Sequence, residues 1–248
     1  NGAVLDIRAG GYVNTNAPTY AGGSILKYNS GGNYGIFTEW TPNIATGTGV
    51  PSNVMIGDLI SGSGLDFSPA GQYRRLTGNL TISTNAYFGL STTANGNLQI
   101  GGDFTNNGTF AANGRIVTFN GTANQAISGN TTFSVIVNSN TSGTVSIPNG
   151  TNISITTTGT LNTANTTTSV DGTITNQGTI TGFADATRGL RFNASGVYNH
   201  NLNGGSIPFA TWNLNSNCNI TGVTITIPTV STFDQGFGNF TWNSTSQS

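Results

Sequence analysis

Short runs in which apolar and polar residues alternate follow one another along most of the chain. Each run places every second side chain on one face, which is the pattern of a β-strand with one buried face. Apolar residues at the three- and four-residue spacing of an amphipathic helix are rare. The pattern therefore predicts an all-β protein, with inward-facing side chains that include Ile100, Phe119, Val135 and Ile174. The clearest runs are Leu80–Ile82, Leu98–Ile100, Ile116–Phe119, Val135–Val137, Val145–Ile147, Ile153–Ile155 and Val223–Ile227.

Clusters of Gly, Asn and Ser separate these runs. Asn106–Gly108, Ser128–Asn130 and Pro148–Gly150 are examples. Gly adopts positive φ angles without a steric penalty, and Asn tolerates them better than most residues. We therefore expect a tight turn with a positive φ at each of these clusters.

Two segments of the sequence recur. Gly78-Asn-Leu-Thr-Ile returns as Gly96-Asn-Leu-Gln-Ile, and Gly102-Asp-Phe-Thr-Asn-Asn-Gly-Thr-Phe returns as Gly172-Thr-Ile-Thr-Asn-Gln-Gly-Thr-Ile. The first spacing, from position 78 to 96, matches one coil of a β-solenoid, and the second, from 102 to 172, matches three or four coils of irregular length. The turn signals also come more often than the spacing of about 8–12 residues that is usual in sandwiches. We therefore predict a right-handed parallel β-helix, and an antiparallel β-sandwich is the alternative.

The composition favours stacked strands as well. Gly, Thr, Asn and Ser make up 133 of the 248 residues, and only 6% of residues are charged. Ordinary globular chains carry about 25% charged residues. In a parallel stack, equivalent residues lie about 4.8 Å apart, where repeated charges repel and neutral polar side chains can hydrogen-bond. Residues 78–182 accordingly contain three charges, Asp103, Arg115 and Asp171.

Aromatic residues divide the chain into three parts. After Phe133 none occurs until Phe183, and the others gather toward the two ends. We expect one continuous solenoid segment over residues 1–248. It would have an irregular N-terminal part at 1–77, regular coils at 78–182 and an aromatic-rich C-terminal part at 183–248.

The formal net charge of −1 argues against partners that are recruited by charge. Nucleic-acid binding needs clustered Lys and Arg, and Arg74-Arg75 is the only basic doublet. No apolar run approaches the roughly 20 residues of a membrane-spanning helix. We expect no nucleic-acid partner and no membrane span.

Carboxylates are the first candidates for chemistry, because parallel β-helices include polysaccharide lyases and hydrolases. Such reactions need paired carboxylates, or a carboxylate with a basic group, on one face. The candidates are Glu39, Asp58 and Asp66 with Arg74 and Arg75, all within the irregular part of the chain. We interpret the acids as solvated residues of turns, and we predict no catalytic residue and no enzyme activity.

One His and one Cys are the remaining reactive residues. His200 and Cys218 are well separated in the sequence and have no further ligand types nearby, which is a weak metal signature. We predict a structural His200 that is hydrogen-bonded beside Trp212, and a buried Cys218 that acts as a small apolar residue. No metal and no cofactor are expected.

The three Trp residues occur in different contexts. Trp212 and Trp242 each follow Thr and precede Asn, which indicates an alternating strand with the ring inward. Trp40 lies between Glu39 and a turn that contains Pro42, which indicates a surface position. Exposed aromatic rings can stack on sugars, so Tyr34 and Trp40 are the candidate glycan contacts.

Three stretches of the chain carry a resemblance to a known family. They begin at Gly11-Tyr-Val-Asn, at Gly101-Gly-Asp-Phe-Thr-Asn-Asn-Gly and at Tyr198-Asn-His-Asn, and the last ends in Phe237-Gly-Asn-Phe-Thr-Trp-Asn. Together they resemble the repetitive secreted and cell-surface β-solenoid proteins of Bacteroidetes that the type IX secretion system exports. Relatives often carry a second Cys after the Phe-Thr-Trp-Asn stretch, where this chain has Ser244. The resemblance therefore leaves a disulfide partner for Cys218 in doubt.

The resemblance implies a location outside the cell or at its surface and a contact with the type IX secretion machinery during export. Combined with the repetitive composition, it indicates a non-enzymatic structural or adhesin segment that acts as a rigid stalk or binding scaffold. Surface glycans or other surface proteins are the expected partners. The alternative is a carbohydrate-binding module or a carbohydrate-active β-helix.

Overall fold

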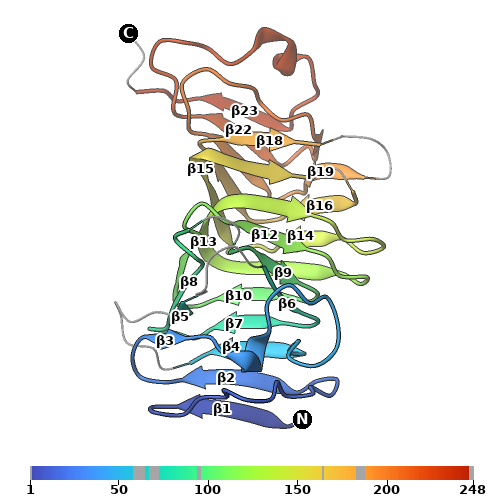
Figure 1. The fold of residues 1–248 in the computed structure, drawn as a ribbon. Coiled ribbons are helices and arrows are strands. Elements are labelled where there is room, and N and C mark those ends of the chain that lie inside the picture. Colours follow the sequence, from blue (N-terminus) through green and yellow to red (C-terminus); the bar gives the residue numbers. More distant parts are fainter. Residues whose placement is uncertain are drawn as a thin grey trace. The chain divides into compact units, whose positions relative to one another are not determined.

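The computed structural model describes residues 2–57, 65–66, 73–93, 96–163, 165–182 and 188–245. Nearly all of its regular structure is β-strand, and the strands pair in parallel (Figure 1). The chain divides into two compact units, Asn1–Gly121 and Thr122–Ser248. The boundary between them falls inside the range 78–182. A single continuous core through the whole chain stays a prediction.

The first unit is a solenoid whose strands stack on three sides of each coil. One side consists of β1 (Val4–Arg8), β2 (Ile25–Asn29), β4 (Asn53–Ile56), β7 (Leu80–Ile82) and β10 (Phe104–Asn106), each paired in parallel with the next. The second side consists of β3 (Tyr34–Gly35), β5 (Leu65–Asp66), β8 (Tyr87–Gly89) and β11 (Thr109–Ala111). The third consists of β6 (Arg74–Leu76), β9 (Leu98–Ile100) and β12 (Ile116–Phe119).

The second unit is built in the same way. β13 (Gln125–Asn138) and β15 (Asn152–Asn162) are long strands that continue around a corner, so each contributes to more than one side. One side continues through β14 (Val145–Ile147), β16 (Thr167–Val170), β19 (Gly189–Phe192) and β21 (Thr211–Trp212). The others continue through β17 (Thr173–Asn176), β20 (Val197–His200), β22 (Asn217–Ile220) and β23 (Asn239–Trp242), and through β18 (Thr179–Thr181).

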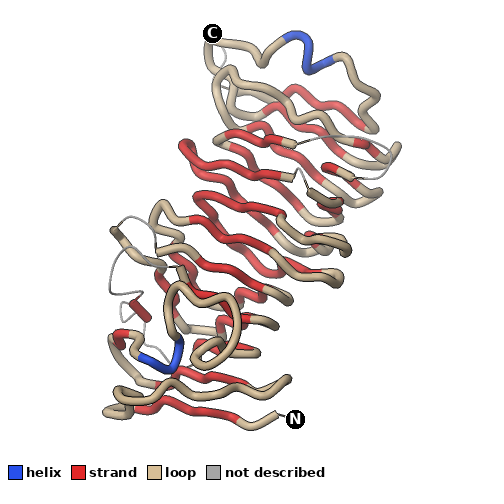
Figure 2. Tube along the Cα trace, turned by 45° about the vertical axis from the view of Figure 1, so that its right-hand side comes forward, coloured by secondary structure: helices blue, strands red, loops and turns tan. Residues whose placement is uncertain are grey.

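These pairings confirm the predicted right-handed parallel β-helix. Successive strands of each unit lie side by side (Figure 2), and their residue pairings show that they run in the same direction. The antiparallel sandwich is excluded, because its neighbouring strands would run in opposite directions.

One coil is longer than the first sequence repeat predicted. Leu80 pairs with Phe104, and Ile174 pairs with Tyr198, so a complete coil runs from position 80 to 104 and from 174 to 198. The two recurring segments that begin at Gly78 and Gly96 form β7 and β9, which stack on different sides of the solenoid. The repeat therefore marks two similar strands within one coil, and its interpretation as one complete coil is wrong.

The second repeat marks a recurrent shape of corner between two strands. Asn106 ends β10 and Asn176 ends β17, both are buried, and each side-chain oxygen accepts the N–H of the Gly two residues later at 3.1 Å. A Cβ on Gly108 or Gly178 would lie within 2.4 Å of a carbonyl oxygen of the neighbouring coil. Gly108 is therefore required for close approach, and the positive φ predicted there is wrong. Positive φ angles do occur at Gly129 and Gly150, as predicted.

The core of each unit consists of the inward rows of these strands. Ile100, Phe119 and Ile174 are all fully buried, as predicted. Val135 is only half-buried, and Ile136 takes the inward position with 1% of its surface exposed. The reason is a register shift in β13, where Phe133 pairs with Ile155 but Val135 pairs with Thr160. The strand turns a corner at Ser134, which changes the face to which the next side chains point.

Neutral side chains form hydrogen-bonded ladders on the outer faces, as the composition predicts. The Asn152 amide donates to the side-chain oxygen of Asn130 at 2.7 Å. The Asn219 amide donates to the side-chain oxygen of Asn199 at 3.0 Å. Each bond joins one coil to the next at matched register, so the stack is held by side chains as well as by the backbone.

Helical structure in the described part of the chain is limited to two 3-10 turns. They are η1 (Thr38–Trp40) and η2 (Val230–Phe233), the blue segments of Figure 2. No helix within the described ranges is long and apolar enough to cross a bilayer.

Candidate functional site

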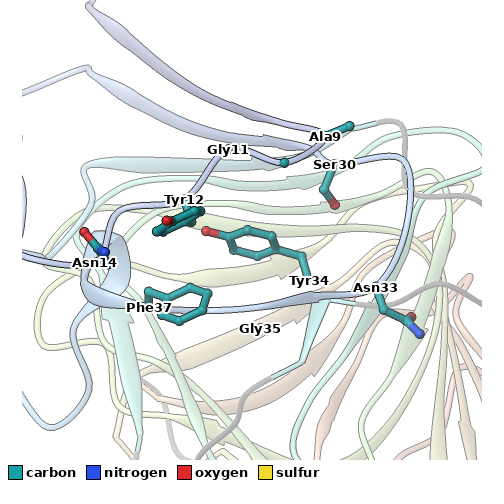
Figure 3. Close-up of a pocket in the computed structure, with 10 residues that line it drawn as sticks. Ala9, Gly11, Tyr12, Asn14, Ser30, Asn33, Tyr34, Gly35 and Phe37 are labelled. Atoms are coloured by element: carbon teal, nitrogen blue, oxygen red, sulfur yellow. The ribbon is translucent and has the colours of Figure 1, made fainter.

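An open pocket in the first unit is lined by three aromatic rings. Its volume is about 520 Å³, and its rings are those of Tyr12, Tyr34 and Phe37. The centroids of the Tyr12 and Phe37 rings lie 6.0 Å apart, as do those of Tyr34 and Phe37. Figure 3 shows the three rings together, with the side chains of Ser30 and Asn33 on the other side of the view. The pocket therefore combines an apolar wall with neutral polar groups.

Two loops position these rings. Tyr12 lies in the loop after β1, which is held because the Gly11 N–H donates to the Arg8 carbonyl at 2.8 Å. Tyr34 begins β3, and its ring packs against the buried ring of Tyr28 at 5.6 Å between centroids. Phe37 immediately precedes η1. Two connections of the solenoid therefore meet at the pocket.

A buried carboxylate supports the loop that carries Phe37. Glu39 is 0% exposed, and its Oε1 accepts the Phe37 N–H at 3.1 Å and the Tyr28 hydroxyl at 3.3 Å. The Tyr20 hydroxyl donates to the Glu39 carbonyl at 2.7 Å. The prediction that Glu39 is a solvated turn residue is therefore wrong, because η1 folds its carboxyl group inward onto these donors.

Arg74 supports the same loop from the neighbouring β6. Its side chain is buried, and its Nε donates to the Trp40 carbonyl at 2.9 Å. The Trp40 indole N–H donates in turn to the Arg75 carbonyl at 2.8 Å. η1 and β6 are therefore joined by two hydrogen bonds, and each element donates one and accepts the other. Arg74 and Glu39 hold residues 37–40 in place, and neither is arranged as an accessible acid or base.

Burial also determines the protonation of this cluster. Desolvation raises the pKa of Glu39, and hydrogen bonds, including those from the Phe37 N–H and Tyr28, oppose that rise. Desolvation likewise raises the pKa of Tyr20, Tyr28 and Tyr34, and the charge of Glu39 raises each of them further. The three phenols therefore stay neutral at physiological pH.

The two candidate glycan contacts lie in different surroundings. Tyr34 lines the pocket, and its role as a glycan contact stays a prediction. Trp40 is 0% exposed. The predicted surface position of Trp40 is wrong, and a ring without exposed surface cannot stack on a sugar. The exposed aromatic rings next to Tyr34 are those of Tyr12 and Phe37, and the ring of Trp40 is not among them.

Asp58 and Asp66 were the other candidate acids. Asp58 lies outside the described residues, and Asp66 lies in β5, where only the backbone position is described. No group of three or more His, Cys, Asp or Glu side chains that could hold a metal occurs in the described ranges.

His200 belongs to a buried hydrogen-bond chain in the second unit. The Asn176 amide donates to the Tyr198 hydroxyl at 3.1 Å, and the Tyr198 hydroxyl lies 3.0 Å from His200 Nδ1. His200 Nε2 lies 2.8 Å from the Gly204 carbonyl, which can only accept, so Nε2 carries the proton. Burial lowers the pKa of His200 and keeps the ring neutral. The predicted structural role holds, although the direct ring neighbour is Tyr198, which in turn contacts Trp212.

Cys218 is fully buried beside this chain, as predicted. Desolvation raises the pKa of its thiol to about 12. A thiol with so little thiolate character is unreactive. At the position where relatives in the resembled family often carry a second Cys, the Ser244 hydroxyl accepts the Val223 N–H at 3.3 Å.

Tyr34 is the one pocket residue that the sequence marked as a candidate contact, and Tyr12 and Phe37 were missed. Tyr12 and Phe37 come from separate loops, and neither belongs to a strand. One feature of the sequence could have indicated them. Tyr12 and Phe37 lie outside any alternating run, so no strand turns their rings toward the core.

Comparison of the chain with protein-family models, with curated proteins and with solved structures gave no match. The fold and the geometry of the pocket therefore carry the functional argument.

The buried carboxyl group makes a prediction about pH. Glu39→Gln keeps an acceptor oxygen for the Phe37 N–H and removes the ionisation. Folding raises the pKa of Glu39, so the protonated side chain is tolerated in the folded state better than the charged one. Its contribution to stability is fully present below the pKa of the unfolded state, about 4.3, and is lost as the pH rises through the pKa of the folded state. We expect the free energy of unfolding of Glu39→Gln, relative to wild type, to increase from about pH 3.5 to about pH 7.5.

The increase should be about 1.4 kcal/mol for each unit by which folding raises the pKa. Urea unfolding at the two pH values measures it. Asp6→Asn is the matched control, because it also removes a carboxylate, and the Asp6 carboxylate is partly exposed and pairs with the exposed Arg8. A difference between Glu39→Gln and wild type that stays constant over this range would contradict the inferred burial of the charge.

Proposed function

We propose that the chain is a non-enzymatic scaffold segment of a large secreted or cell-surface protein. In this role the stacked coils act as a rigid stalk that carries binding surfaces on its loops. The observation that carries the proposal is the in-register parallel pairing that repeats within each unit. Four successive strands of one side, β17, β20, β22 and β23, keep the same register without a shift.

The physical basis of the proposal is the way in which such a stack resists deformation. Strands such as β7 and β17 are hydrogen-bonded to the coil before them and to the coil after them. Asn side chains add bonds along the same direction. The stability of a solenoid is approximately the sum of its coils and of the interfaces between neighbours. A long array of such coils therefore keeps its loops at fixed spacing.

The surface location rests on the resemblance to secreted Bacteroidetes solenoids. Under this proposal the type IX secretion machinery is a partner during export, and surface glycans or other surface proteins are partners afterwards. Uncharged outer ladders suit an exposed protein of this kind, because they give little attraction for nucleic acids or other polyanions.

The proposal is tested on cells that express the natural protein. Antibodies raised against the purified chain should label intact cells, or precipitate the protein from the culture medium, and protease added to intact cells should remove the cell-bound label. The purified chain should release no reducing ends from a panel of polysaccharides. Labelling only after permeabilisation would contradict the location. Cleavage that a single acid-to-amide substitution abolishes would contradict the non-enzymatic role.

A further inference from the structure

Two aromatic rings in the pocket of the first unit are exposed to an unusual degree. Tyr12 is 61% exposed and Phe37 is 50% exposed, although both are large and apolar. Several other aromatic residues of this unit lie in the core, among them Tyr28, Phe88 and Phe104, each 0% exposed. The fold therefore has room to bury rings, and it leaves these two adjacent rings at the surface.

The exposed rings are held in place before any ligand arrives. The loop with Tyr12 is fastened to η1, because the Thr38 N–H and hydroxyl both donate to the Val13 carbonyl, at 3.3 Å and 2.8 Å. Glu39 accepts the N–H of Phe37 itself. A ligand that stacks on these rings therefore binds with little loss of ordering entropy.

The polar groups of the pocket are neutral. Its ten lining residues include Asn14, Ser30 and Asn33 and no charged side chain. The nearest charge in the sequence, Arg8, already pairs with Asp6 at 2.9 Å. A charged ligand would lose hydration here without meeting an opposite charge among the lining residues, so the lining favours a neutral ligand.

The lining suits a neutral molecule that has apolar faces and carries hydroxyl groups at its edges. The volume of about 520 Å³ falls within the range of about 300–1,000 Å³ for small-molecule sites. Aromatic rings accept the C–H face of such a molecule. The Asn14 amide can donate to a hydroxyl, since the bond to Thr15 uses only its oxygen, and the Ser30 oxygen can accept, since it donates its own hydrogen to the Gly32 carbonyl.

We propose that this pocket binds a neutral oligosaccharide. Sugar rings stack on Tyr12 and Phe37, and Asn14 and Ser30 bond the hydroxyl groups. Tyr34 forms the floor against Tyr28. The site goes beyond a scaffold role, because it gives one loop region of the solenoid a ligand of defined chemical class.

The test is a screen of the full chain against an array of neutral and acidic oligosaccharides, followed by calorimetric titration of the glycans that bind. We expect neutral glycans to bind and acidic ones of equal length to bind more weakly. Tyr12→Ala and Phe37→Ala should each weaken binding about tenfold or more. Tyr12→Phe should retain most of the affinity, because it keeps the ring.

Phe209→Ala is the matched control, because Phe209 is 55% exposed and belongs to the second unit, whereas the lining residues of the pocket all belong to the first. It should leave the affinity unchanged. Thermal unfolding should show that Tyr12→Ala remains folded, which separates loss of contact from loss of structure. Absence of any bound neutral glycan, preference for acidic glycans, or equal loss of binding in Phe209→Ala would overturn the proposal. Binding of an apolar peptide in place of glycans would overturn it as well.

Discussion

Ile136→Asp should destabilise the protein far more than Val135→Asp, although the two residues are adjacent in β13. Ile136 is 1% exposed and pairs with Leu161, whereas Val135 is half-buried and pairs with Thr160. Loss of a buried Ile side chain costs about 2–5 kcal/mol, and an unpaired buried charge costs several more. We expect Ile136→Asp to lower the free energy of unfolding by at least about 4 kcal/mol.

Val135→Asp should cost about 1 kcal/mol, the centre of the distribution for single substitutions, because Val135 is only half-buried. Urea unfolding followed by circular dichroism measures both variants. Ile136→Val is the control for volume, and we expect it to cost about 0.5–1.5 kcal/mol. Equal losses for the two Asp variants, or a larger loss for Val135→Asp, would contradict the register shift at Ser134.

This pair of residues shows where the sequence pattern reaches its limit. Val135, Ile136 and Val137 are all apolar, so alternation alone allows two opposite assignments of the inward face. The corner at Ser134 decides which of these residues faces inward. The Ser134 carbonyl oxygen lies so close to Gly159 that a Cβ on Gly159 would be only 2.3 Å from it. Gly159 belongs to the next coil. The face of Val135 therefore depends on a contact with a residue that is distant in the sequence.

The class of fold was predictable because it depends on local patterns that agree with one another. Short alternating runs, few charges and recurrent Asn-x-Gly segments all favour stacked strands, and the parallel pairing confirms them. The length of a coil was not predictable from the repeat at positions 78 and 96. Strands on different sides of a coil bury similar residues, so β7 and β9 share a sequence without sharing a side.

The surroundings of the candidate site were less predictable than the fold. Glu39 and Trp40 stand in a polar, irregular stretch that is typical of a surface turn. They are buried because β6, which comes from a later coil of the chain, brings Arg74 against the carbonyl of Trp40. Local composition carries no information about such a contact. A second long-range contact, the bonds of Thr38 to the Val13 carbonyl, holds the loops that carry Tyr12 and Phe37 together at the pocket.

Trp212→Ala should cost about 3–5 kcal/mol of stability, the usual range for loss of a buried aromatic side chain. Trp212 is 9% exposed, and its ring stacks on Phe192 with 4.4 Å between centroids and 8° between planes. Its indole N–H donates to the Gln235 side chain at 2.8 Å. The inward position predicted for Trp212 is confirmed.

Trp242 offers a matched comparison, because the sequence analysis predicted the same inward position for it. Trp242 follows His200 and Ile220 in an inward row of the second unit, and both of those residues are fully buried. Trp242 itself is 39% exposed, so the predicted burial is wrong even though its register position is the inward one. Its ring contacts Phe233 at 6.3 Å between centroids.

We expect Trp242→Ala to cost about 1–2 kcal/mol, less than the loss in Trp212→Ala, because 39% of Trp242 is already exposed to water. Thermal and urea unfolding, monitored by far-ultraviolet circular dichroism, measures both variants without relying on the fluorescence of the ring that is removed. Trp212→Phe should recover much of the loss, since a second aromatic ring can still stack on Phe192. Equal losses at the two Trp positions would mean that the Trp242 ring is covered in solution as fully as Trp212.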